Sequence, residues 1–142
     1  MAQRALNVLT TDECLALLRK SRVGRLVYLD DLGPVAVPVN FALIDGDVVF
    51  RVSGGTKQAA MNQPSVAFEV DHIQDDERSG WSVIVRGKGQ EVPLHEVPQL
   101  LRDSAGNFPA PWANGVHNVW LRITPEKVTG RRLGEETYAL LI

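Results

Sequence analysis

The stretch PVAVPVNFALIDGDVVFRVSGGTK, residues 34–57, decides the fold class of this chain. It holds two apolar runs rich in β-branched residues, 34–43 and 47–53, separated by an Asp-Gly pair that is typical of a tight hairpin turn. The run GRLVYL at residues 24–29 precedes them across a link of only four residues. Because parallel strands need a longer crossover, these three segments predict an antiparallel meander.

The remainder of the chain continues the strand pattern. Further strands are expected at residues 66–70, 81–92 and 119–123, with a short extension at 128–133. Short helices are expected at residues 56–61 and 95–102, and residues 103–115 have the composition of a loop. Gly87 and Gly89 interrupt the long fifth strand, as expected of a bend in a curling sheet. Six strands with short helices at the corners predict a mainly β protein, an antiparallel barrel whose closure removes exposed edges.

A helix is expected before the first strand. Thr10 and Glu13 stand at capping-box spacing, with Leu9 and Cys14 placed as a hydrophobic staple. Gly24 is the expected stop. Nothing near Cys14 marks it as a reactive thiolate, so we interpret it as a small buried apolar residue.

Length and composition indicate one domain over residues 1–142, large enough to bury a core without disulfides. The 15 basic and 17 acidic residues give a formal charge of −2, and the basic residues are dispersed, which argues against nucleic acid or an anionic membrane as partner. The single cysteine cannot form an intramolecular disulfide. No stretch approaches 18 apolar residues and the N-terminus lacks an apolar leader segment, so we expect a cytoplasmic location.

Few residues suggest catalysis or metal binding. His72, His95 and His117 lie 22 or more residues apart, so no metal site is expected. No nucleophile elbow, Walker loop or dinucleotide fingerprint is present, and no catalytic residue can be named. The acidic residues around His72 are interpreted as a solvated loop.

One segment does suggest a ligand, RVSGGTK at residues 51–57. Its glycines allow a tight turn and a close ligand approach, and the helix start that follows attracts anions. Arg51 and Lys57 add charge, while Ser53 and Thr56 add hydroxyl donors. These features suit a phosphate monoester. An ordinary strand–turn–helix with a Thr N-cap and solvent-exposed basic residues is the alternative that spacing alone leaves open.

The run PVNFALIDGDVVFRVSGGTKQAAMNQPSVAFEVD, followed by GWSVIVRGKGQEV, resembles the pyridoxamine 5′-phosphate oxidase-like proteins, the flavin-binding split-barrel group. The resemblance covers about residues 8–133. It lies in the order of the elements: a Pro-Val-Asn strand, a hairpin, a Phe-Arg strand, Gly-Thr-Lys, a helix, Asn-x-Pro and a long strand with Gly-Lys. It implies a six-stranded antiparallel split barrel and a homodimer that binds FMN in a groove between its subunits.

The resemblance also implies a set of cofactor-binding residues: Pro38, Val39, Asn40, Phe50, Arg51, Thr56, Lys57 and Ser82. The first three would run beside the isoalloxazine ring. Phe50 and Arg51 would lie near the ribityl phosphate, which Thr56 and Lys57 would bind. Ser82 would reach the flavin from the long strand.

The function implied by the resemblance is an FMN-dependent oxidoreductase acting on a small organic substrate. An F420 (deazaflavin)-dependent reductase is one alternative, and a non-catalytic flavin- or haem-binding protein is another; haem would need an axial ligand such as His72 or His117. Oxidation of pyridoxamine phosphate is not expected. Val35 and Asn40 replace basic residues of the true oxidases, and residues 122–133 lack their aromatic residue and histidine.

Overall fold

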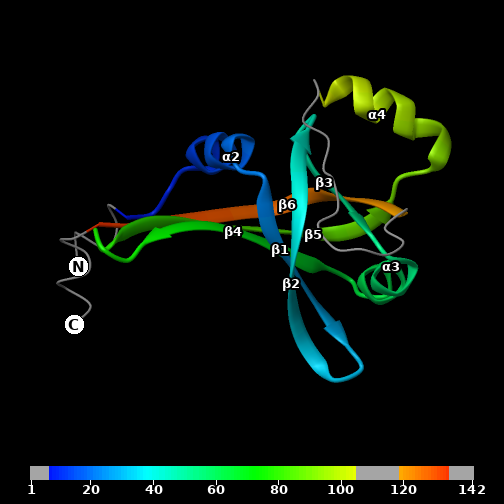
Figure 1. Ribbon diagram of the computed structural model, residues 1–142, viewed down its shortest axis with the longest axis horizontal. Coiled ribbons are helices and arrows are strands. Elements are labelled where there is room, and N and C mark those ends of the chain that lie inside the picture. The colour runs from blue at the N-terminus through cyan, green and yellow to red at the C-terminus, as the bar shows by residue number, and fades with distance from the viewer. Residues whose placement is uncertain (1–6, 105–118, 135–142) are drawn as a thin grey trace.

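The computed structural model describes residues 7–104 and 119–134. Within these residues six strands form a closed antiparallel barrel in the order β1-β2-β3-β6-β5-β4 (Figure 1). The strands are β1 (Val23–Asp30), β2 (Gly33–Ile44), β3 (Asp47–Val52), β4 (Val66–Gln74), β5 (Ser79–Glu91) and β6 (Val119–Leu133). The helices are α2 (Thr11–Lys20), α3 (Gly54–Met61) and α4 (Val97–Asp103), the last preceded by the 3-10 turn η1 (Leu94–Glu96). The predicted mainly β barrel is confirmed.

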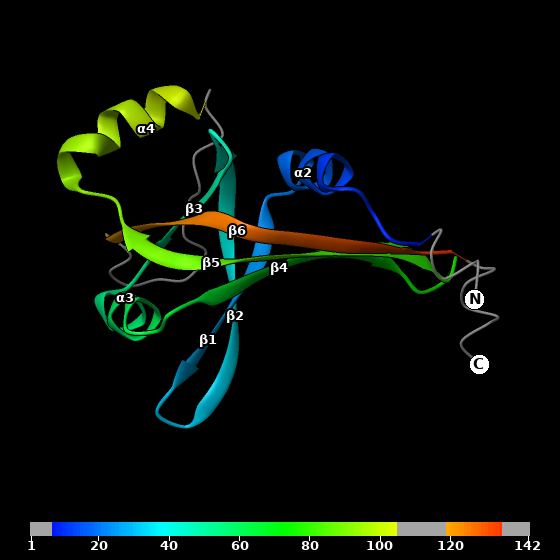
Figure 2. The same ribbon diagram turned by 180° about the vertical axis from the view of Figure 1, so that it is seen from behind.

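The predicted meander of β1, β2 and β3 is confirmed, and its second turn has the geometry that the sequence requires. Asp45 and Gly46 have φ values of 51° and 84°, in the left-handed region that Asp-Gly pairs tolerate. The hairpin between β1 and β2 projects away from the barrel, as do the far ends of β4, β5 and β6 (Figures 1 and 2). The barrel therefore carries two arms that leave it in different directions.

The sixth strand differs from its prediction, because residues 119–133 form one strand and not two. The register between β5 and β6 shifts at Arg86/Gly87, where Gly87 pairs with Pro125 and Arg86 with Lys127. This bulge lets β6 continue past a proline that cannot donate a ladder hydrogen bond. A Cβ on Gly87 would lie 2.4 Å from the Thr124 carbonyl oxygen, so the bulge needs glycine here.

The main core fills the barrel. Phe68 lies between two aromatic rings, stacked on Phe50 with centroids 5.4 Å apart and meeting Phe41 edge to face at 5.0 Å. Helix α2 closes one end of the barrel with Cys14 and Leu18, both fully buried. A second apolar cluster lies under α4, on the outer side of the strands: Ala42, Ile44, Val49, Val92, Leu100 and Trp120.

The start of α2 confirms the predicted capping box. The Glu13 backbone N–H donates to Thr10 Oγ1 at 3.1 Å, and the Thr10 N–H donates to Glu13 Oε1 at 2.9 Å. The helix ends at Lys20, with Ser21 as its C-cap, earlier than the predicted stop at Gly24, which is the second residue of β1. A span across a bilayer would need a longer and more apolar helix than any found in residues 7–104 and 119–134. Most of the predicted loop at residues 103–115, and His117, lie outside the described residues.

Candidate functional site

Strands β2 and β3 part after a short ladder, and the predicted ring-binding and phosphate-binding residues flank the point where they part. The ladder ends at the Phe41–Phe50 pair. Beyond it, residues 38–40 pair with β1, whereas Arg51 pairs with Trp120 of β6. The two strand segments therefore follow different neighbours, which is the split in the barrel.

Arg51 is half-buried at this split and has an unsatisfied polar atom. Its guanidinium carbon lies 5.2 Å from the centroid of the Trp120 ring, a cation–π contact. Its Nε is buried and has no hydrogen-bond partner, and Arg51 forms no ion pair within the described parts of the chain. An unsatisfied buried donor costs about 1–3 kcal/mol. A bound acceptor, such as a phosphate oxygen, would remove that cost.

The helix after β3 begins two residues earlier than predicted. Helix α3 starts at Gly54, and its N-cap is Ser53, not the threonine of the alternative that spacing alone left open. The Thr56 N–H donates to Ser53 Oγ at 3.4 Å, and the Ser53 hydroxyl donates to Thr56 Oγ1 at 3.2 Å. The two glycines therefore occupy the first helical turn, where backbone N–H groups have no intrahelical acceptor.

Neither of these glycines is required by the fold. Gly54 and Gly55 do not have positive φ values, and a Cβ built on either would have no heavy atom of another described residue within 4 Å, apart from its chain neighbours and the backbone of its own helix. Glycine lowers helix stability relative to alanine. The open space in front of this helix start would let a ligand approach the backbone closely.

Lys57, the second basic residue of the predicted phosphate site, forms an ion pair with a carboxylate. Its Nζ lies 3.1 Å from Oε1 of Glu91, the last residue of β5. The sequence does not mark Glu91 as a site residue, because it lies 34 residues from Lys57 in the chain. Only the packing of α3 against β5 brings the two together, and no local pattern signals it.

The remaining predicted residues are divided between the site surface, the core and the far end of the sheet. Pro38 is exposed, Asn40 is half-buried, and Val39 packs partly against the core. Phe50 is fully buried, so its side chain belongs to the core and not to the site surface. Ser82 is half-buried on β5, nine residues before Glu91, which is about 30 Å along the strand. Within a single chain, Ser82 and the Lys57 ammonium therefore do not lie close together.

A second polar cluster lies on the outer face of β1 and β4. Arg25 Nη1 lies 2.9 Å from Glu69 Oε1 and 2.8 Å from Asp71 Oδ2. Burial and a hydrogen bond with Asp71 raise the pKa of Glu69 to about 7, against the opposing effect of Arg25. One guanidinium cannot neutralise two adjacent carboxylates fully, so this pair holds a proton near neutral pH.

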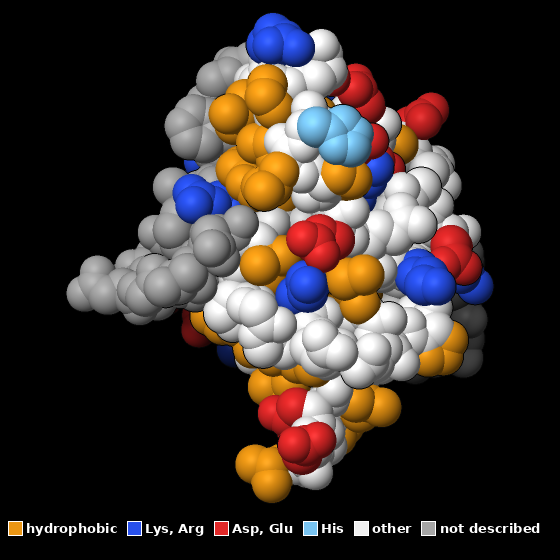
Figure 3. Space-filling view, turned by 90° about the vertical axis from the view of Figure 1, so that its right-hand side faces the viewer, with side chains coloured by type: hydrophobic (Ala, Val, Ile, Leu, Met, Phe, Trp, Pro, Cys, Tyr) orange, Lys and Arg blue, Asp and Glu red, His pale blue; other side chains and the backbone are white. Residues whose placement is uncertain are grey.

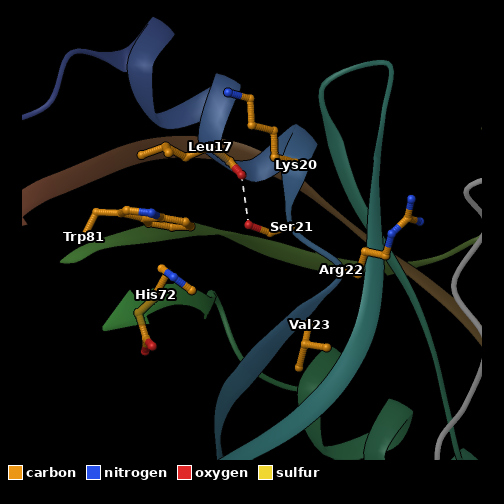
Figure 4. A pocket seen from close by; sticks show the side chains of 8 residues that line it. Leu17, Lys20, Ser21, Arg22, Val23, His72 and Trp81 are labelled. Atoms are coloured by element: carbon orange, nitrogen blue, oxygen red, sulfur yellow. Dashed lines mark hydrogen bonds between the residues drawn. The ribbon is translucent and has the colours of Figure 1, made fainter. Parts of the chain in front are cut away.

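A hollow of about 430 Å³ lies between the end of α2 and the β4–β5 arm (Figure 4). Figure 4 shows Trp81 and His72 on one side and Val23 on the other, beneath Leu17 and Ser21. His72 is exposed and lies 3.4 Å from the Gln74 amide nitrogen. No group of three or more His, Cys, Asp or Glu side chains that could hold a metal occurs among the described residues.

A closed six-stranded antiparallel barrel whose β2 and β3 part beside a helix start defines a split-barrel protein. The chain belongs to the pyridoxamine 5′-phosphate oxidase family, whose sequence model matches residues 10–132. The predicted family resemblance is therefore confirmed.

Three relatives illustrate this membership. The uncharacterized protein Rv0080 of Mycobacterium tuberculosis is 34% identical over 131 residues, covering 88% of this chain and 84% of that protein. The FAD binding protein from Mycobacterium smegmatis is 33% identical with a TM-score of 0.71, covering 90% of this chain and 98% of that chain. A FAD-binding protein from Mesorhizobium loti (mll6688) is 28% identical with a TM-score of 0.71, covering 90% and 96% of the two chains.

Proposed function

We propose that this protein binds a flavin nucleotide, with its phosphate at residues 51–57 and its ring beside residues 38–40. The observation that carries the proposal is the buried Arg51 Nε, which has no hydrogen-bond partner in residues 7–104 and 119–134. It lies at the split between β2 and β3, two residues before the N-cap of a helix whose first two glycines no other described residue obstructs. A phosphate there would accept from Arg51 and from first-turn amides, and the helix dipole would favour its charge.

Similar proteins support a flavin as the ligand, because the M. smegmatis and M. loti relatives are named as FAD-binding. FMN and FAD share the ribityl phosphate, so the site fits either of them, and FMN is the simpler occupant. When bound, the flavin supplies the redox chemistry, and the protein supplies binding, orientation and electrostatics. The activity we propose is that of an oxidoreductase for a small organic substrate.

The position of Ser82 supports a site shared by two copies of the chain. Ser82 lies about 30 Å along β5 from Glu91, the partner of Lys57, and this span is longer than a flavin mononucleotide. If Ser82 contacts a flavin held at Lys57, it does so from a second subunit. We therefore propose a homodimer with two equivalent flavin sites, as expected for a two-fold interface.

Spectroscopy and titration test this proposal. The purified protein should show flavin bands at ~370 and ~450 nm, whereas a haem protein would show a Soret band. Arg51→Ala and Lys57→Ala should each weaken FMN binding about tenfold to a hundredfold, since a hydrogen bond to a charged group contributes roughly 1.5–3 kcal/mol. Riboflavin, which lacks the phosphate, is the matched control and should change little. Equal losses for FMN and riboflavin would refute a phosphate role for these residues.

A further inference from the structure

Lys57 and Glu91 form an ion pair that spans two elements at the proposed phosphate site. Lys57 lies in the first helical turns of α3, and Glu91 is the last residue of β5. The Nζ–Oε1 distance is 3.1 Å, with the two side chains 30% and 43% exposed. A ligand can therefore reach both groups. The helix is held against the strand beside them, since the Ala60 carbonyl oxygen would lie 3.8 Å from a Cβ on Gly89.

Figure 3 looks onto this end of the molecule, where basic and acidic side chains are scattered and some lie side by side. Arg122, which pairs with Gln90 next to Glu91, has its own carboxylate partner, Glu96, at 3.2 Å. Arg51 alone among these cations has no carboxylate partner within the described chain. Arg51, Lys57 and Glu91 together carry one net positive charge. This charge matches a singly charged phosphate better than a doubly charged one.

We propose that Glu91 is an internal counter-ion of the phosphate site, which releases Lys57 when a phosphate binds and disfavours a doubly charged phosphate. The inference rests on the flavin-nucleotide function proposed above and adds a charge preference to it. A phosphate monoester such as that of FMN carries about −1.5 to −2 at pH 7, because its second pKa is about 6. Each phosphate of the FAD pyrophosphate bridge carries a single charge. Glu91 therefore shifts the site toward FAD and away from FMN.

The test compares Glu91→Gln with the wild type in titrations of FMN, FAD and riboflavin at pH 7.5 and low salt. Exposed ion pairs contribute up to about 1 kcal/mol, so removing the charge should tighten FMN binding about twofold to fivefold. FAD binding should tighten less, and riboflavin binding should not change. At pH 5.5, where the FMN phosphate is mostly singly charged, the gain for FMN should shrink toward that for FAD.

The matched control is Glu96→Gln, which removes a neighbouring carboxylate that pairs with Arg122 and not with Lys57. It should leave all three affinities unchanged, and circular dichroism should show both variants folded. If the ratio of FMN affinity to FAD affinity is the same in Glu91→Gln as in the wild type, the inference about Glu91 is overturned. Weaker FMN binding by Lys57→Ala would still support the phosphate site itself in that case. A wild-type protein that binds no flavin overturns the proposed function and the inference together.

Discussion

Replacing Gly55 by alanine should have opposite effects on folding and on flavin binding. Its φ is not positive, and a Cβ there would meet no heavy atom of the described parts of the chain within 4 Å, so alanine fits without strain. A compatible Gly→Ala change stabilises a protein by about 0.4–1 kcal/mol through the unfolded state. For a chain of 142 residues this corresponds to a rise in Tm of about 1–4 °C. The same methyl group would occupy the space through which a phosphate approaches the helix start, and FMN binding should weaken about tenfold or more.

The assay pairs thermal unfolding of the flavin-free protein with fluorescence titration of FMN and riboflavin. Gly24→Ala is the matched control, because the same chemical change there places a Cβ 2.2 Å from a ring carbon of Phe68. Overpacking of this kind costs about 1–3 kcal/mol, so its Tm should fall. Unchanged FMN affinity in a stabilised Gly55→Ala variant would show that no phosphate approaches this turn. A lower Tm for flavin-free Gly55→Ala than for the flavin-free wild type would show that the fold needs glycine at this position.

Three further predictions follow from other parts of the molecule. The pKa of Glu69 is about 7 in the folded protein, against 4.5 ordinarily. The folded state therefore binds more protons than the unfolded state between these pH values. The stability that the protonated form of Glu69 contributes is lost as the pH rises toward 7. Glu69→Gln should therefore raise the free energy of unfolding measured with urea by on the order of 1 kcal/mol at pH 8 but not at pH 4. Equal changes at the two pH values would contradict this prediction. Light scattering of the flavin-bound protein should give a dimer of the 15.6 kDa chain, and a monomer that retains flavin would exclude a shared site. Pyridoxamine 5′-phosphate should be at best a poor substrate, and turnover at about 1 per second or faster would overturn that expectation.

Local patterns predicted most of the fold, because most of its decisive signals are local. The Asp45-Gly46 turn and the capping box between Thr10 and Glu13 each depend on residues within four positions of one another. The β6 strand did not follow its local signal, since Pro125 indicates a break. The bulge that accommodates it requires Gly87 on a neighbouring strand, where a Cβ would meet the Thr124 carbonyl. The extent of β6 is therefore set by its pairing with β5 and not by its local sequence.

The candidate site was predicted less completely for the same reason. Arg51 and Lys57 lie in one short segment, so their anion chemistry could be inferred from spacing. Ser53 and Thr56, three positions apart, are both compatible with a helix start, and the helix expected from Thr56 begins two residues earlier, after Ser53. Glu91 is joined to the segment only by the packing of α3 on β5, across 34 residues of chain.

Two features of residues 51–55 work against the stability of the protein without a ligand. The Arg51 Nε is buried without a hydrogen-bond partner among the described residues, and the first turn of α3 carries two glycines that no described contact requires. Unsatisfied polar groups and unneeded glycines are selected against in a structure shaped only for stability. Local departures of this kind are expected where function sets the sequence. Both features lie in residues 51–55 at the split between β2 and β3, while the capping box and the aromatic core follow the ordinary rules, and this favours the binding function proposed for residues 51–57.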